Sequence, residues 1–185
     1  APTGHGVPPR LDVAAGTYAP AAGDGNARWT GGAGAAALSG GFGNDTYLVD
    51  NSGDAVTEVA GQGTDTVNTI LASYILRANV ENLNFTGAGN FAGTGNTLAN
   101  VIVGGAGNDT LDDGGVGGVD TMNGGAGNDT YFVRNAGERI LDSGVGVNTV
   151  TTTLLSSTLA GNLQNLAFIG TGNFTGTGNV SDNVL

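Results

Sequence analysis

The chain has 185 residues, including 36 glycines, 4 prolines and no cysteine, and its formal net charge is −11. The lack of cysteine excludes a disulfide framework and a cysteine-based zinc site. The excess of acidic residues repels nucleic acid and anionic membranes and attracts divalent cations. A hydrophobic content of 39% is too high for a disordered acidic tail, and no apolar run is long enough to span a membrane.

Residues 1–21 are interpreted as a linker or leader. Their sequence begins APTGHGVPPRLDV, which is rich in proline and glycine. It has no positively charged stretch followed by an apolar core, so it is not a secretory signal peptide. We expect either another export route or a chain that is a segment of a longer one.

From residue 22 onward the dominant feature is a nonapeptide with the pattern Gly-Gly-x-Gly-x-Asp-x-(Leu/Tyr)-x. Complete copies are GGFGNDTYL at 40–48, GGAGNDTLD at 104–112 and GGAGNDTYF at 124–132. Degenerate copies in phase with these occupy 22–30, 31–39, 95–103 and 115–123. Glycine permits tight turns that expose carbonyl oxygens, and the aspartate adds a carboxylate. Oxygen ligands of this kind are what Ca²⁺ prefers.

The segments between the glycine turns predict short β-strands. Residues 46–49 and 65–70 alternate apolar residues with threonine or asparagine, and many of them are β-branched. Residues 70–77 and 153–160 could instead form a helical turn, but their threonines and serines argue against it. Because a single strand-and-turn unit cannot bury an apolar face alone, tandem units are expected to stack into an all-β solenoid.

A longer duplication overlies the nonapeptides. The sequence GNDTYLVDN at 43–51 returns as GNDTYFVRN at 127–135, and the segment at 79–96 returns at 162–179. We therefore divide the chain into two related units, 22–103 and 104–185, which are continuous with one another. The last residues match those that precede a complete nonapeptide in the first unit, so we expect a segment of a longer array.

One substitution and two recurring aromatic positions in this duplication call for interpretation. Asp50 in the first copy is Arg134 in the second, which we interpret as an outer position that tolerates either charge. The aromatic residues recur at equivalent positions, as Phe85 with Phe168 and Phe91 with Phe174. We expect stacked core aromatics there, with a sugar-binding strip as the alternative.

These motifs resemble the repeats-in-toxin, or hemolysin-type, calcium-binding modules of secreted bacterial proteins. The resemblance is specific at the complete nonapeptides and extends in weaker form over about residues 22–132. It implies a right-handed parallel β-roll in which two nonapeptides form one coil and Ca²⁺ lies between stacked turns. It also implies an extracellular or cell-surface protein whose folding is coupled to calcium binding, exported by type I secretion.

The resemblance also implies which residues bind calcium. The strongest site would lie between the stacked repeats at 104 and 124. Its ligands would be the carboxylates of Asp109 and Asp129 and the carbonyls of Gly105, Gly107, Gly124 and Ala126. The insertion of Asp113 and Gly114 between these repeats threatens their register.

Weaker sites are implied on other coils. Asp120 would pair with Glu138, which falls in the aspartate phase of the following turn. Asp45 would have Ala27 as its partner one coil earlier, so a site there would contain a single carboxylate from the repeats.

The sequence contains no catalytic constellation. The single histidine, His5, has no partner for a zinc site or a serine triad, and no glycine-rich turn is followed by the lysine of a phosphate-binding loop. The chain is therefore predicted not to be an enzyme.

Two alternatives to a calcium-binding module stay open. One is a structural or adhesive repeat protein that self-associates end to end or contacts a cell surface or polysaccharide. The other is the accessory module of a secreted enzyme whose catalytic domain lies elsewhere.

Overall fold

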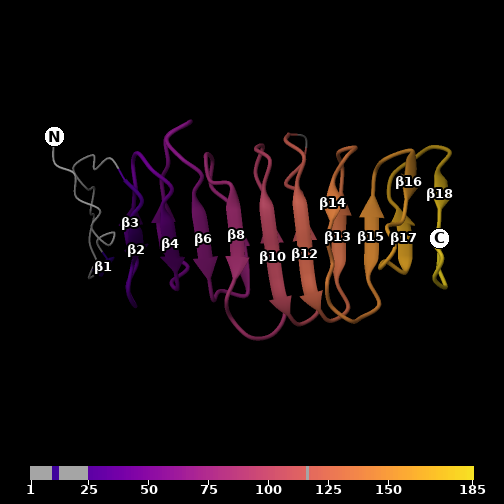
Figure 1. Cartoon of the computed structure of the whole chain (residues 1–185), viewed down its shortest axis with the longest axis horizontal. Helices are drawn as coiled ribbons and strands as arrows, with labels where there is room; N and C mark the ends of the chain where they lie inside the picture. The colour runs from indigo at the N-terminus through magenta and orange to yellow at the C-terminus, as the bar shows by residue number, and fades with distance from the viewer. Residues whose placement is uncertain (1–9, 13–24, 116) are drawn as a thin grey trace.

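The computed structural model describes residues 10–12, 25–115 and 117–185, and every helix or strand assigned in these ranges is a β-strand. The larger sheet extends from the N-terminal end of the solenoid to β14, and further coils follow it toward the C-terminus (Figure 1). Its strands, in spatial order, are β1 (Arg10–Asp12), β2 (Arg28–Thr30), β4 (Thr46–Val49), β6 (Thr66–Thr69), β8 (Asn82–Phe85), β10 (Val101–Ala106), β12 (Thr121–Ala126) and β14 (Arg139–Ile140). All pairings in this sheet are parallel.

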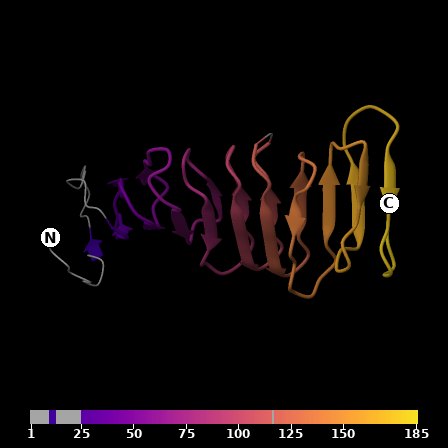
Figure 2. The ribbon, with the colours of Figure 1, turned by 45° about the horizontal axis from the view of Figure 1, so that its top comes forward.

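A second layer is formed by strands that alternate with those of the larger sheet in sequence and continue beyond β14; Figure 2 shows the same ribbon turned by 45°. Its main sheet contains β7 (Ser73–Ile75), β9 (Ala92–Thr94), β11 (Thr110–Asp112), β13 (Thr130–Val133), β15 (Thr149–Thr152) and β17 (Asn165–Phe168). Two short parallel pairs complete the fold: β3 (Ala37–Leu38) with β5 (Ala55–Val56), and β16 (Ser156–Thr158) with β18 (Thr175–Thr177). Alternation of strands between layers makes each coil one turn of a parallel β-solenoid. The all-β stacked fold predicted from the repeats is confirmed.

The core is a column of inward-facing side chains in which each coil contributes to both layers. In the first sheet Trp29, Tyr47 and Val67 are aligned in the strand register, and each is at most 5% exposed. The column continues through Leu83, Ile102 and Met122, and its partners in the second sheet are Leu111, Tyr131, Val150 and Leu166. Burial has a period of two along strands such as β4, where Tyr47 and Val49 are buried and Thr46 and Leu48 are only partly buried.

Both segments that could have formed a helical turn are extended, because they contain β7 and β16. The Asp113–Gly114 insertion does not disturb the register. Val101 pairs with Thr121 on one layer, and Thr110 pairs with Thr130 on the other. The additional residues therefore lengthen the intervening turn and leave both strands in phase, within a range of 16 to 20 residues per coil.

Strand β10 (Val101–Ala106) crosses the boundary between the two sequence units, so the solenoid is continuous there. Most of the predicted linker at residues 1–21 lies outside the described residues; its described part, β1, pairs with β2. No helix capable of crossing a membrane occurs in the described ranges.

The expected aromatic stacks are present: Phe85 and Phe91 are buried and stacked at 4.6 Å. Phe168 and Phe174 are also stacked, at 4.8 Å, but they are only partly buried, so the expectation of core aromatics holds for the first pair and not for the second.

Candidate metal centre

Two ladders of side-chain oxygens run along the solenoid. One lies at the turns that precede the strands of the larger sheet, and the other lies at the turns that precede the strands of the second layer. In the first ladder, Asp45 Oδ1 accepts the backbone N–H of Ala27, and Asp65 Oδ1 accepts that of Asp45, each at 2.7 Å. Each of these residues directly precedes a strand of the larger sheet, so the contact recurs from coil to coil. The positions of this ladder are Ala27, Asp45, Asp65, Glu81, Asn100, Asp120 and Glu138.

The second ladder lies at the opposite turns and contains the two aspartates of the predicted strongest site. Asp109 Oδ1 accepts the N–H of Phe91 at 2.8 Å, and Asp129 Oδ1 accepts the N–H of Asp109 at 2.8 Å. The next step is an amide, because Asn148 Oδ1 accepts the N–H of Asp129 at 2.8 Å. The structure thus stacks Asp109 and Asp129 on consecutive coils. Whether the pair binds a metal stays a prediction.

Each of several ladder acids has a second oxygen that is buried and has no hydrogen-bond partner. These atoms are Asp45 Oδ2, Asp109 Oδ2, Asp120 Oδ2, Asp129 Oδ2 and Glu138 Oε1. A buried anionic oxygen without a partner is costly, because it has lost its hydration and gained nothing in exchange. The ladders therefore use one oxygen of each acid to join coils and direct the other into the protein, where a cation would stabilise it.

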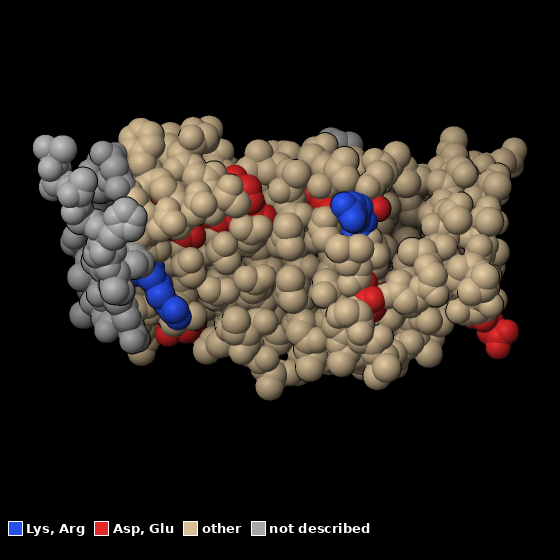
Figure 3. Space-filling view, in the orientation of Figure 1, with Lys and Arg blue, Asp and Glu red and all other residues tan. Residues whose placement is uncertain are grey.

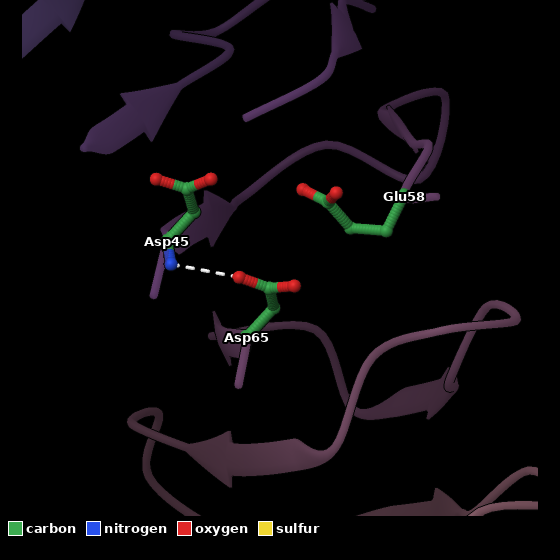
Figure 4. Close-up of side chains that lie close together, drawn as sticks. All are labelled: Asp45, Glu58 and Asp65. Carbon is green, nitrogen blue, oxygen red and sulfur yellow. Dashed lines mark hydrogen bonds between the residues drawn. The ribbon is translucent and has the colours of Figure 1, made fainter. Parts of the chain in front are cut away.

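Three carboxylates converge at one place in the first ladder, and we call Asp45, Glu58 and Asp65 the first corner (Figure 4). One oxygen from each of the three lies within 4.8 Å of the others. Their exposed fractions are only 1%, 7% and 1%, respectively. Glu58 Oε2 joins Asp45 Oδ2 among the buried oxygens that have no partner.

Glu58 reaches this position because it follows β5 and stacks on the first glycine of the preceding repeat. Its Oε1 accepts the N–H of Gly40 at 3.2 Å, and its backbone carbonyl accepts Asn79 Nδ2 at 2.9 Å. These two contacts hold the glutamate side chain over the coil that carries Asp45. The corner is therefore assembled from the turns that precede β4 and β6 on two consecutive coils.

The first corner is electrostatically unfavourable without a counter-ion. Burial, followed by the negative charges of Asp65 and Asp45, raises the pKa of Glu58 to about 7. Burial also raises the pKa of Asp65 to about 6, against the hydrogen bond from Asp45 N–H, and it raises the pKa of Asp45. No basic side chain in the described ranges forms an ion pair with these groups. A cation with oxygen ligands would remove the repulsion.

The carbonyls predicted as ligands lie in or beside paired strands. Gly105 and Ala106 of β10 are in register with Gly125 and Ala126 of β12. The Ala126 carbonyl accepts the N–H of Gly107 at 2.8 Å, so one of its two lone pairs is already used. Gly124 lies in β12 beside the Asp129 carboxylate: a Cβ built on Gly124 would lie 2.1 Å from Asp129 Oδ2.

The structure also stacks the second predicted pair, since Glu138 Oε2 accepts the N–H of Asp120. Burial, and then the charges of Glu138 and Asp113, raises the pKa of Asp120 to about 7. Asp45 stacks on Ala27, as its repeat phase predicts, but Asp65 follows it on the other side. The site expected to contain one carboxylate from the repeats therefore contains three carboxylates.

Sequence reasoning missed Glu58 and Asp65. A signal for Asp65 is present, because Gly61, Gly63 and Asp65 occupy the second, fourth and sixth positions of a degenerate nonapeptide at 60–68. Glu58 carries no motif. It is found only from the register that places it on Gly40, one coil away.

The interpretation of position 134 as one that tolerates either charge is wrong. Arg134 is half-buried and donates from Nη1 to Asp113 Oδ1 at 2.9 Å and from Nη2 to Asp112 Oδ2 at 2.9 Å. Asp113 is fully buried, so the arginine neutralises a carboxylate that water does not reach. Here the protein supplies its own cation, which it does not do at the first corner.

Charged groups occupy little of the molecular surface. On the face shown in Figure 3, acidic atoms are visible only as small areas among uncharged neighbours. The chain is strongly acidic, with 16 aspartates and glutamates, yet at least eight of its aspartates and one glutamate are buried. These are Asp45, Asp54, Asp65, Asp109, Asp113, Asp120, Asp129, Asp142 and Glu58. Many of the acidic side chains therefore lie inside the protein, several of them in the first corner and along the two ladders.

Comparison with known proteins gives one informative similarity. Over 74 residues the chain is 46% identical to the endo-1,3-1,4-beta-glycanase ExsH of Rhizobium meliloti (strain 1021). The match covers 40% of this chain and only 16% of that protein. No protein-family model and no solved structure matches the chain. The chain is thus a β-solenoid repeat module that is similar to a small part of a glycanase.

Proposed function

We propose that the chain is an extracellular calcium-binding β-roll module whose folding is coupled to Ca²⁺. The observation that carries the proposal is the first corner: three buried carboxylates converge, and two of their oxygens have no partner. Asp45, Glu58 and Asp65 would hold the ion. When bound, it would supply the positive charge that these groups lack, and the stacked pairs Asp109–Asp129 and Asp120–Glu138 are proposed as further sites.

The ligand chemistry favours Ca²⁺ over other metals. The corner offers only oxygen atoms, whereas zinc and copper sites generally draw on histidine or cysteine. Mg²⁺ demands a near-ideal octahedron and retains several waters, while Ca²⁺ accepts more oxygens in flexible geometry. Carboxylates from different coils, alternating with glycine turns, fit the more permissive ion.

Coupling to folding follows from where the acids lie. With little calcium, folding buries mutually repelling carboxylates; at millimolar extracellular calcium, bound ions offset this cost. A single site stabilises the folded state by RT ln(1 + [Ca²⁺]/Kd), about 2.7 kcal/mol at one hundred times Kd.

The similarity to an endo-glycanase supports a second proposal, that the module accompanies an enzyme acting on a polysaccharide outside the cell.

The direct test is a calcium titration of the chain by far-UV circular dichroism and thermal unfolding, with EGTA reversal and Mg²⁺ as the competing ion. The variant Asp45→Asn/Glu58→Gln/Asp65→Asn removes the charge of the first corner and retains its shape. Asp109→Asn/Asp129→Asn does the same for the stacked pair, and Asp182→Asn, at an exposed position, is the matched charge control.

We expect calcium to raise the unfolding temperature of the unaltered chain and of Asp182→Asn. The calcium response should be weaker in the triple variant of the first corner and in Asp109→Asn/Asp129→Asn. In EGTA, the triple variant should be more stable than the unaltered chain. A chain that is equally folded in EGTA and in calcium, with no bound ion by equilibrium dialysis, would overturn the proposal. The structural or adhesive alternative would then be preferred.

A further inference from the structure

The duplication places a second version of the first corner in the C-terminal unit. We call Asp129, Asp142 and Asn148 the second corner. The equivalent positions are Asp45 and Asp129, Tyr47 and Tyr131, Glu58 and Asp142, Asp65 and Asn148, and Glu81 and Gln164. The local frames agree, because Asn79 donates to the Glu58 carbonyl and its counterpart Asn162 donates to the Asp142 carbonyl.

The hydrogen bonds along the ladder, from one coil to the next, are the same in both corners. Asp65 Oδ1 accepts the N–H of Asp45 at 2.7 Å, and Asn148 Oδ1 accepts that of Asp129 at 2.8 Å. The next step repeats the pattern. Glu81 accepts the N–H of Asp65, and Gln164 accepts that of Asn148, each at 2.7 Å. Amides thus perform the same structural task as acids, so stacking of the coils does not require negative charge at positions 65 and 81.

The difference between the corners lies in what satisfies the remaining oxygens. In the second corner, Asn148 Nδ2 donates to Asp142 Oδ2, and the Tyr131 hydroxyl donates to the same oxygen at 3.0 Å. Tyr131 also accepts the N–H of Gly124 at 2.8 Å. In the first corner the corresponding hydroxyl, Tyr47 Oη, and the corresponding carboxylate oxygen, Glu58 Oε2, have no partner.

We infer that the second corner is the metal-independent counterpart of the first, because the Asn148 amide donates to Asp142 where a cation would neutralise Glu58. The residue at the position shared by Asp65 and Asn148 decides whether the corner takes a divalent cation. At this position metal control is then confined to the first corner. In the second corner, hydrogen bonds from Asn148 and Tyr131 satisfy Asp142, while Asp129, whose Oδ2 has no partner, is left to the proposed site with Asp109. The inference rests on the proposed function of the first corner.

Reciprocal exchanges test it on the whole chain, with Ca²⁺ as the probe. Bound calcium is counted by equilibrium dialysis for the unaltered chain, Asp65→Asn and Asn148→Asp. Hydrogen exchange in EGTA and in calcium then follows peptides covering 58–66 and 142–149. Asp65→Asn should lose one ion and gain protection of 58–66 in EGTA. Asn148→Asp should gain one ion, and its segment 142–149 should become protected only in calcium.

Asn148→Ala separates a gained site from simple damage. Both Asn148 variants lose the amide, so both should unfold more easily in EGTA. Calcium should restore Asn148→Asp and leave Asn148→Ala unchanged. If Asn148→Asp binds no additional ion or is not restored, while Asp65→Asn loses one, the inference fails and the proposed function stands. If the unaltered chain binds no calcium, the proposed function fails first.

Discussion

The Asp45 carboxylate lies directly against the α-carbon of Gly40, the first residue of its own repeat. A Cβ built on Gly40 would lie 1.9 Å from Asp45 Oδ2 and 2.5 Å from Tyr47 Oη. Gly40 does not have a positive φ, whereas Gly41 and Gly43 do. The first glycine of the repeat is thus required for space beside the carboxylate, and the later ones are required for backbone conformation.

Gly40→Ala should therefore damage the first corner specifically. The added methyl group forces the Asp45 side chain away, which we expect to destabilise the fold by about 1–3 kcal/mol, as overpacking does. It should also weaken the calcium response, measured as the shift in unfolding temperature between EGTA and calcium. The control is Gly161→Ala, where nothing lies within 4 Å of the added atom. Equal behaviour of the two variants would contradict this account.

Stability without calcium should fall as pH rises. The folded-state pKa values of Glu58 and Asp65, about 7 and about 6, lie above their ordinary values of 4.5 and 3.8. Protonation of these groups therefore favours the folded state. Their penalty is absent below about pH 4, grows as pH rises, and is complete above about pH 7.

In EGTA, the unfolding temperature should accordingly decrease between pH 5 and pH 8. Saturating calcium holds the carboxylates in their charged form, so it should remove most of this decrease. The triple variant of the first corner should show a shallower pH dependence in EGTA, with Asp120 accounting for part of what remains. A flat profile for the unaltered chain in EGTA would show that these carboxylates are not protonated in the folded state.

The two equivalent tyrosines predict unequal effects of one small change. Tyr47 and Tyr131 are both fully buried, but only Tyr131 has hydrogen-bond partners, Gly124 N–H and Asp142. Tyr131→Phe leaves both partners short of a bond and should cost about 1–2 kcal/mol. Tyr47→Phe removes a buried hydroxyl without a partner and should leave stability unchanged or raise it. Urea unfolding of both variants in EGTA provides the comparison, and equal losses would be inconsistent with it.

Arg134 should matter more than an ordinary surface arginine. Burial acts to raise the pKa of Asp112, but the hydrogen bonds and positive charge of the Arg134 guanidinium, together with hydrogen bonds from Gly114 N–H and Asp113, lower this pKa below its ordinary value. The same side chain neutralises the buried Asp113. Arg134→Gln should destabilise the chain by about 1–3 kcal/mol, since hydrogen bonds to charged groups are of this size. Arg139→Gln, at an exposed position of β14, should stay within about 0.5 kcal/mol, as surface changes do. A matching loss in both variants would argue for a nonspecific charge effect.

The sequence by itself determined the repeating unit and therefore the fold. Glycine turns that alternate with period-two segments permit only short strands, and strands too short to bury a face alone must stack. The aspartate phase was also local information, which is why the stacking of Asp109 on Asp129 and of Asp120 on Glu138 follows from the nonapeptide.

Only the tertiary structure decided which acids share a corner. Asp65 lies 20 residues from Asp45 and Glu81 lies 16 residues from Asp65, so coil length varies and no fixed period aligns them. Glu58 belongs to the first corner because Gly40, on the preceding coil, donates its backbone N–H to Glu58 Oε1. The chemical difference between Asp65 and Asn148 likewise acquires meaning only when the folded turn brings Glu58 or Asp142 beside it, as the hydrogen bond from Asn148 to Asp142 shows. Partners contributed by different coils depend on stacking register, which is a property of the assembled solenoid and not of any one repeat.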